Sequence, residues 1–164
     1  MKQTLQRLAL TALALSAPFA TQAQTSDLLI SEYVEGNSLN KAVELYNGTA
    51  GSINLATGQY RLELYSNGAS TSSQSIALTG TIAAGATLVL CHASADAAIL
   101  AVCNVQSSGT INFNGDDALV LRKACATAGS GTVVDSLGQV GFDPSSEWGT
   151  GLQSTADNTI RRKN

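Results

Sequence analysis

The sequence predicts an all-β sandwich behind a short secretory leader. Short runs rich in β-branched and aromatic residues alternate with clusters of Gly, Asn and Ser, which is the rhythm of strands joined by tight turns. No long stretch has the periodicity of an amphipathic helix. The chain has 164 residues, of which 44% are hydrophobic and 13% charged, so it is large enough to bury a single core.

The first 23 residues have the pattern of a signal peptide. Lys2 and Arg7 precede an apolar run over residues 8–19, and Ala23 offers a small residue for cleavage. The run is about a dozen residues long, shorter than the roughly 20 that a membrane-spanning helix needs. We therefore expect residues 1–23 to be a secretory signal, residues 24–164 to form one domain without a transmembrane segment, and the protein to be secreted or periplasmic.

Alternating apolar and polar side chains indicate the strands of the first half. In the first strand Leu28, Ile30 and Val34 face inward, whereas Ser31 and Tyr33 face outward. Asn-Gly pairs, which are strong turn signals, follow the second and third strands. The expected strands of this half cover residues 28–34, 41–47, 60–66, 74–78 and 87–91.

The second half should supply three more strands and a loop-rich ending. The strands are expected over residues 110–113, 118–122 and 132–136, and they would pack side by side. Phe142 and Trp148 lie in the loops that follow, and we expect them to plug one end of the core.

The chain contains three cysteines, Cys91, Cys103 and Cys125. Export permits disulfides, and an odd number leaves one thiol unpaired. Asp96 suits the start of a short helix over residues 97–100, so a bond between Cys91 and Cys103 would close a compact loop. Free buried thiols are the alternative, since spacing alone does not fix pairing. Cys125 lies in an expected loop, where an exposed thiol would allow a disulfide-linked dimer.

The charge balance disfavours strong independent binding of nucleic acid. Loss of the signal peptide removes two of nine basic residues and none of twelve acidic ones, which shifts the net charge from −3 to −5. Tight binding to DNA relies on Lys and Arg that neutralise phosphates. One local basic patch remains at residues 161–163.

A calcium site is one interpretation of the polar turn at residues 112–117. Asp116 and Asp117 would supply carboxylate ligands, but the spacing does not fit an EF-hand loop. The favoured alternative is a turn in which one of these carboxylates accepts hydrogen bonds from nearby backbone amides.

Catalytic patterns are otherwise missing from the sequence. His92 is the only histidine and has no evident catalytic partner. The glutamates on the polar sides of strands are interpreted as solvated sheet-face charges rather than a hydrolytic pair. No nucleophile elbow, phosphate loop or dinucleotide-binding signature is present. The glutamates are Glu32, Glu35, Glu44 and Glu63. Four tyrosines alternate with core positions: Tyr33, Tyr46, Tyr60 and Tyr65. The favoured interpretation is that they are partly buried cross-strand neighbours, and the alternative is an exposed aromatic surface that contacts a ligand or protein.

Several segments together resemble the lamin tail domain, an immunoglobulin-like β-sandwich. They are Ile30-Ser31-Glu32-Tyr33, Val43-Glu44-Leu45-Tyr46-Asn47, Asn114-Gly115-Asp116-Asp117 and Val133-Val134-Asp135. Residues 138–141, 147–148 and 157–163 are similar to the version of this domain that precedes an endonuclease/exonuclease/phosphatase-type catalytic domain in secreted bacterial nucleases. Residues 124–128 depart from that version, which has a short Gly turn there.

The resemblance implies a non-catalytic module that binds or positions, with no cofactor and no active site of its own. The printed residues end at Asn164 and include none of the catalytic residues of those nucleases. The expected partner is an unknown protein, a cell-surface component or extracellular DNA. Two alternatives stay open: a truncated N-terminal part of an extracellular DNA endonuclease, and a freestanding adhesion or interaction protein.

Overall fold

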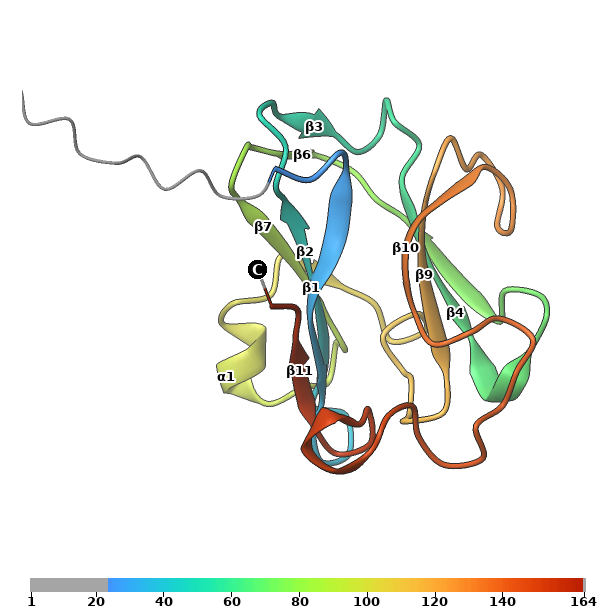
Figure 1. The fold of residues 1–164 in the computed structure, drawn as a ribbon. Helices are drawn as coiled ribbons and strands as arrows, with labels where there is room; N and C mark the ends of the chain where they lie inside the picture. The colour runs from blue at the N-terminus through green and yellow to red at the C-terminus, as the bar shows by residue number, and fades with distance from the viewer. Residues whose placement is uncertain (1–23, 164) are drawn as a thin grey trace, which may run out of the picture.

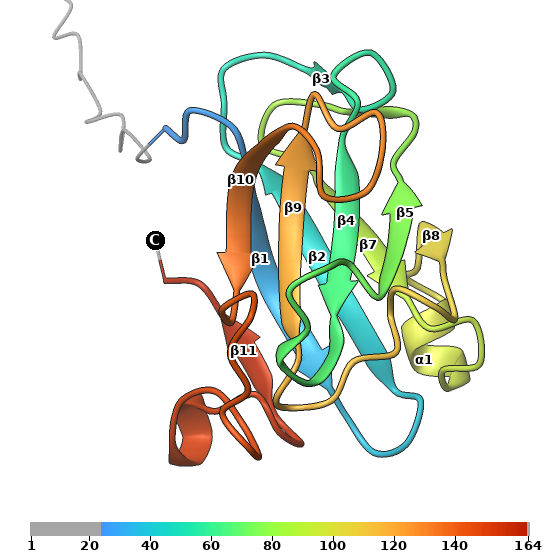
Figure 2. The same cartoon turned by 90° about the vertical axis from the view of Figure 1, so that its right-hand side faces the viewer.

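The structure is a computed structural model that describes residues 24–163, so the predicted signal peptide and Asn164 lie outside the described residues. Two sheets pack face to face with the core between them, as Figures 1 and 2 show, and the expected all-β sandwich is confirmed. The strands are β1 (Leu28–Glu35), β2 (Lys41–Asn47), β3 (Ile53–Asn54), β4 (Arg61–Tyr65), β5 (Gln74–Ala77), β6 (Thr81–Ile82), β7 (Thr87–Cys91), β8 (Val105–Gln106), β9 (Ala118–Lys123), β10 (Thr132–Leu137) and β11 (Thr159–Arg161). The helices are α1 (Ala97–Leu100) and the 3₁₀ turns η1 (Ser66–Gly68) and η2 (Gly151–Gln153).

One sheet has five strands in the order β11-β1-β2-β7-β8, and the other has four in the order β10-β9-β4-β5. The short pair β3 and β6 crosses one end of the sandwich (Figure 1). All pairs are antiparallel except β7 with β8. Among the described residues, no helix has the length and apolar character needed to cross a membrane.

The core lies between the inward faces of the two sheets. On β2, Val43 and Leu45 are fully buried, as the alternation of the sequence predicts. Tyr33 stacks on Phe113 with ring centroids 4.6 Å apart, a geometry that adds to the area it buries. The remaining buried side chains of this cluster are Leu28, Ile30, Leu55, Tyr60, Leu62, Leu64, Leu78, Ile82, Leu90, Ile111, Leu119 and Leu121.

A β-bulge at Ser31 corrects the predicted orientation of the first strand. Ile30 pairs with Leu45 of β2, but Glu32 already pairs with Glu44, so Ser31 is the extra residue. The bulge reverses the alternation beyond it. Tyr33 therefore enters the core at 2% exposure, and Val34 faces outward. An unbroken period of two was the wrong assumption for this strand.

The bulge is held by a clasp that joins β1 to β10 and to the residue after β11. The Ile30 N–H donates to Asp135 Oδ2 at 2.8 Å. Arg162 donates through its guanidinium to both Asp135 oxygens, at 2.7 and 2.9 Å, and through its backbone N–H to the Ser31 carbonyl at 2.9 Å. Backbone groups freed by the bulge thus regain partners, as buried polar groups require. We call Ile30, Ser31, Asp135 and Arg162 the clasp.

Two other expectations about the second half are wrong. Residues 110–113 form a turn and an irregular segment, because the Thr110 and Ile111 amides bond back to Ser107 instead of to a neighbouring strand. Ile111 and Phe113 are nevertheless buried in the core. Phe142 is 52% exposed and lies tilted against the partly buried Trp148, with ring centroids 5.9 Å apart, so Phe142 does not plug the end of the core.

The predicted pairing of Cys91 with Cys103 is confirmed. The disulfide joins Cys91, the last residue of β7, to Cys103, which lies two residues before β8. The two Cα atoms are 5.8 Å apart. The loop that it closes carries α1, which lies on the outer side of the five-stranded sheet (Figure 1).

Removal of this disulfide should destabilise the fold. The bond closes a loop of sequence separation 12, for which the chain-entropy model gives about 3 kcal/mol. We expect the double variant Cys91→Ala/Cys103→Ala to lose a free energy of unfolding of that size in urea denaturation. The single variant Cys125→Ala is the control for loss of a buried thiol without loss of a cross-link. Equal unfolding midpoints for the wild type and the double variant would contradict the expectation.

Loss of the clasp carboxylate should also be measurable. In Asp135→Ala the Ile30 amide and the Arg162 guanidinium lose their acceptor, so we expect the free energy of unfolding to fall by roughly 1–3 kcal/mol. Asp143→Ala is the matched control, because Asp143 lies on an exposed loop and accepts only from the Ser145 amide. Chemical denaturation of both variants measures the difference. Equal losses of the free energy of unfolding would show that the clasp does not stabilise the fold more than an exposed hydrogen bond does.

Candidate functional site

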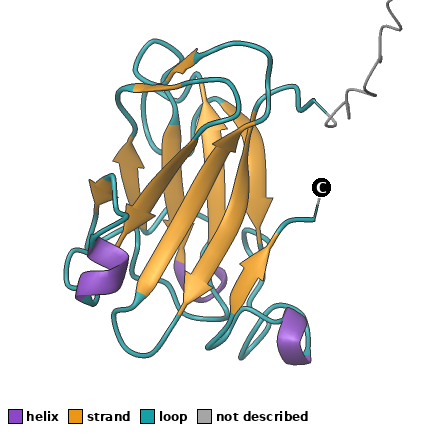
Figure 3. Cartoon of the chain, turned by 90° about the vertical axis from the view of Figure 1, so that its left-hand side faces the viewer, coloured by secondary structure: helices purple, strands orange, loops and turns teal. Residues whose placement is uncertain are grey.

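The outer face of the five-stranded sheet carries an open groove. Figure 3 shows this face, where no segment of residues 24–163 forms a layer over the middle of the sheet. A groove of about 500 Å³ is joined to a hollow of about 340 Å³ through the shared residues Glu32, Glu44 and Arg161. We call the two together the outer groove. Its other lining residues are Leu29, Ser31, Val34, Ala42, Tyr46, Gly85, Val89, Ile99, Val102 and Arg162.

Charged groups of both signs line the outer groove. Glu32 and Glu44 are directly opposite each other on β1 and β2. Arg161 Nε lies 3.0 Å from Glu32 Oε1, and the Ser31 hydroxyl donates to Glu44 Oε1 at 2.7 Å. The cation offsets the repulsion that two facing carboxylates would otherwise feel. Both glutamates lie on the face that the sequence predicts for them.

Apolar side chains border these charges. Val34 and Val89 lie on the sheet, and Val102, which is 62% exposed, follows α1. No histidine or cysteine lines the outer groove. A surface of fixed charges beside apolar side chains is suited to recognition.

The basic patch predicted at residues 161–163 is largely neutralised within the domain. Arg161 is paired with Glu32, and Arg162 with Asp135. Charges that are already paired attract phosphates less than free ones do. The segment acts as the edge of the five-stranded sheet and as one wall of the outer groove.

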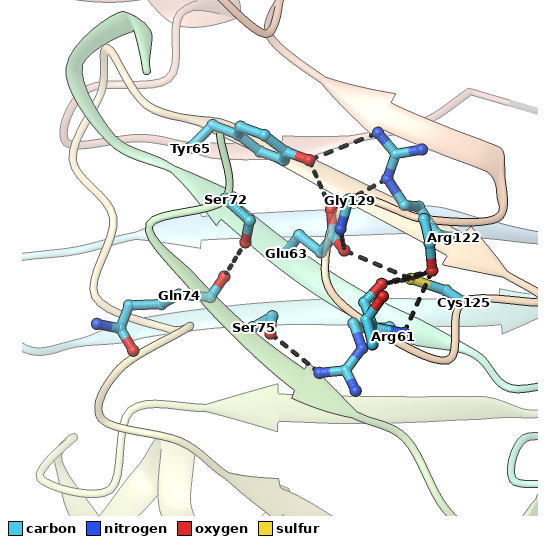
Figure 4. Close-up of polar contacts among 11 residues, drawn as sticks. Arg61, Glu63, Tyr65, Ser72, Gln74, Ser75, Arg122, Cys125 and Gly129 are labelled. Carbon is cyan, nitrogen blue, oxygen red and sulfur yellow. Dashed lines mark hydrogen bonds and ion pairs between the residues drawn. The ribbon is translucent and has the colours of Figure 1, made fainter. Parts of the chain in front are cut away.

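A second polar cluster, shown in Figure 4, lies on the outer face of the four-stranded sheet around Glu63. Its Oε2 accepts from the Tyr65 hydroxyl at 2.6 Å and from Arg122 Nε at 3.0 Å. Its Oε1 accepts from the Gly129 amide at 2.7 Å and from Cys125 Sγ at 3.5 Å. Glu63 is fully buried, so its interpretation as a solvated sheet-face charge is wrong.

The loop between β9 and β10 causes this burial. It folds over the sheet and places Cys125, which is 3% exposed, against Glu63. The loop re-enters β10 through Gly131 at φ 71°, where an added Cβ would collide with the Lys123 carbonyl, so only glycine fits. The expectation of an exposed Cys125 is therefore also wrong, and the geometry gives no support to a dimer linked through it.

The ionised form of Glu63 is stabilised in the fold. Burial by itself would raise the pKa of its carboxyl, but the hydrogen bonds from its four donors outweigh burial and hold the pKa below its ordinary value. A carboxylate kept ionised and fully hydrogen-bonded is suited to fastening a loop. It is a poor general acid or base, which needs a pKa near the working pH.

Glu35 is buried as well, against expectation. Lys41 Nζ lies 2.9 Å from Glu35 Oε1, and the Asp157 amide donates to Glu35 Oε2 at 3.2 Å. The ammonium also lies 5.8 Å from the centre of the Phe113 ring. This pair ties the hairpin between β1 and β2 to the C-terminal segment.

The polar turn at residues 112–117 has the geometry of the favoured alternative. Asp117 accepts from the Asn67 amide at 2.8 Å and from the Asn114 amide at 2.9 Å. Asp116 Oδ1 is buried without a partner among the described residues. Within residues 24–163, no three His, Cys, Asp or Glu side chains come together as metal ligands would. We propose no calcium site.

His92 and the tyrosines have packing roles. His92 is 5% exposed, and its Nδ1 accepts from the Ser94 amide at 3.0 Å. Tyr33, Tyr60 and Tyr65 are buried, and Tyr46 is partly buried on the wall of the outer groove. The interpretation of these tyrosines as partly buried therefore holds for Tyr46, whereas the other three are more deeply buried than expected.

Loss of the Glu63 charge should cost stability in a pH-dependent way. Glu63→Gln breaks the buried pair with Arg122, and we expect it to lower the free energy of unfolding by roughly 3 kcal/mol at neutral pH. Because the folded pKa is lowered, the stabilisation exists above the unfolded value of about 4.3 and is lost as the pH falls below it. The stability of the wild type should thus fall more steeply in acid than that of the variant.

Urea denaturation between neutral pH and about pH 3 tests this. Glu44→Gln is the matched control, because Glu44 is a partly exposed glutamate on the other sheet, where we expect a cost of about 1 kcal/mol or less. Parallel pH profiles for the wild type and Glu63→Gln would contradict a lowered pKa.

Comparison with known proteins agrees with this architecture. The family model described as the Lamin Tail Domain matches residues 21–141. None of the curated proteins compared with the chain matches it. The matched region contains β1 to β10 and both polar clusters around Glu63 and Glu44, whereas β11 and Arg162 lie beyond it. The family is immunoglobulin-like, as are the two packed sheets. Since the match covers well over half of the sequence, the chain belongs to the lamin tail domain family.

Proposed function

We propose that this protein is a secreted or periplasmic, non-catalytic module that binds another macromolecule through the outer groove. The single observation that carries the proposal is the uncovered face of the five-stranded sheet, on which the Arg161–Glu32 ion pair and Glu44 lie beside apolar side chains. Glu32 and Glu44 are partly buried on strands, so they lose little conformational entropy when a partner binds.

The absence of chemistry of its own is part of the proposal. The buried ionisable groups have structural partners: Glu63 fastens a loop, Glu35 pairs with Lys41, and Asp117 caps backbone amides. None of these three carboxylates lines the outer groove. The two that do, Glu32 and Glu44, are engaged by Arg161 and by the Ser31 hydroxyl.

The partner that best fits the charges is a protein or a cell-surface component. Without its signal peptide the chain carries a net charge of −5, and the two arginines of the groove are paired with carboxylates. Extracellular DNA is disfavoured as a direct partner, because counterion release needs unpaired cations.

The alternative is that these residues are the N-terminal part of an extracellular DNA endonuclease. The similarity of residues 138–141, 147–148 and 157–163 to nuclease-associated lamin tail domains favours it. Because β11 is an edge strand and Arg162 lines the outer groove, a following domain would begin beside that groove. The gene sequence beyond the codon for Asn164 distinguishes the two: an in-frame nuclease domain favours the endonuclease, and a stop codon favours a freestanding interaction protein.

A matched pair of substitutions tests the groove. Arg161 and Lys123 each form an exposed ion pair, with Glu32 and Asp27 respectively, but only Arg161 lines the outer groove. Exposed pairs contribute about 0–1 kcal/mol to stability, so both alanine variants should fold. We expect Arg161→Ala, but not Lys123→Ala, to weaken retention of extracellular proteins of the source organism on the immobilised protein, as quantified by mass spectrometry.

Equal retention by both variants would show that the protein binds its partner through a surface other than the outer groove. A DNA-cleavage assay on the purified protein checks the other half of the proposal, and we expect no product. Cleavage that disappears in Glu32→Gln or Glu44→Gln would show that the groove is an active site.

A further inference from the structure

The two stretches of chain that contain β5 and β8 have no charged residue. No Asp, Glu, Lys or Arg occurs between Glu63 and Asp96, and none between Asp96 and Asp116. These two stretches contain β5 and β8, which are edge strands of the two sheets, and Figure 2 shows both at the same side of the molecule. On a chain with a net charge of −5 after loss of the signal peptide, two such stretches are a marked asymmetry. One cation lies beside β5, because the Arg61 guanidinium of β4 donates to Ser75 Oγ at 2.9 Å.

The outer edge of β5 has unpaired backbone groups. β5 pairs with β4 in antiparallel register, with Leu62 opposite Ile76, and the Leu78 amide donates to the Tyr60 carbonyl at 2.9 Å. Hydrogen-bonded positions alternate along such a pair. The N–H and C=O groups of Ser75 and Ala77 therefore point away from β4, and no turn or loop among residues 24–163 bonds to them.

Exposed sheet edges in monomeric proteins are usually protected against pairing with another strand. Lysines, prolines, bulges or a covering loop prevent them from pairing with another strand. β5 is Gln74-Ser75-Ile76-Ala77 and has no charge, no proline and no bulge in its register with β4. Its edge is thus open to a further strand.

We propose that β5 pairs with β5 of a second copy of this chain, in antiparallel register about a two-fold axis at Ile76. Ser75 of one copy then lies opposite Ala77 of the other, which joins the open groups by about four main-chain hydrogen bonds. Two four-stranded sheets become one continuous sheet of eight strands.

Charge favours a second copy as the occupant. Two molecules that each carry a net charge of −5 repel one another over most of their surfaces, and least where no acidic residue lies. An edge strand that carries no charge of its own is also self-complementary, as an isologous interface requires. Because a four-residue edge buries less area than a stable interface of about 1,200–2,000 Å², the dimer forms at high protein concentration.

Sedimentation velocity of the purified protein over rising concentrations tests the proposal. We expect a monomer–dimer equilibrium for the wild type. Ala77→Pro removes an outward N–H without disturbing the bonds to β4, and we expect it to weaken association at least tenfold, which corresponds to about 1.4 kcal/mol. The matched control is Ala84→Pro in the exposed turn before β7, where Gly85 at φ 73° indicates a turn that accepts proline.

Two variants with opposite charges at position 77 provide a second test if the proline variant does not fold. Ala77→Lys and Ala77→Glu should each be monomeric, and an equimolar mixture should form a heterodimer, because opposite charges replace like ones across the two-fold axis. A wild type that stays monomeric, or a dimer that persists in all three Ala77 variants, would overturn the proposal. Binding of β5 only to an extended segment of another protein would overturn it as well.

Discussion

The clasp around Ser31 is the constraint on which the rest of the structure depends. One extra residue in β1 reverses the side-chain alternation, so Tyr33 and Glu35 turn inward while Glu32 and Val34 turn outward. The inward pair completes the core and the buried contact with Lys41, and the outward pair lines the outer groove. Asp135 and Arg162 hold the bulge in place. The lining of the outer groove thus depends on the bulge at Ser31, where the Ile30 amide donates a hydrogen bond to Asp135 of the opposite sheet.

The sequence predicts the fold well where each strand obeys a single rule. The alternation of Val43 and Leu45 with Glu44, and the turn at Asn47-Gly48, are enough to place β2. Short elements such as β3, β8 and β11 were not predicted, because two or three residues carry no measurable period. For residues 110–113, by contrast, a strand was predicted where the structure has none. Their apolar content reflects burial of Ile111 and Phe113, which a turn achieves as readily as a strand does.

The two polar clusters differ in how far the sequence could predict them. Glu32 and Glu44 lie on a face that stays open, so their alternation with core residues describes them correctly. Glu63 obeys the same alternation, but a loop later in the chain covers it. A local pattern tells which face of a strand a residue occupies, and not whether that face is covered. The glycines at 129 and 131, and the departure of residues 124–128 from the short turn of similar domains, were the available signals.

The pairing of β11 with β1 has a kinetic consequence. Residues Glu32 and Arg161, which are partners in this pair, belong to the first and last strands of the domain, so the contact closes nearly the longest loop that the chain allows. Contacts of such large sequence separation slow folding, because the loop entropy must be lost before the contact forms. Because the chain is synthesised from its N-terminus, one edge of β1 stays unpaired until β11 has been made. During that interval the nascent chain is exposed to misassembly, and a factor that shields β1 would raise the yield of native protein.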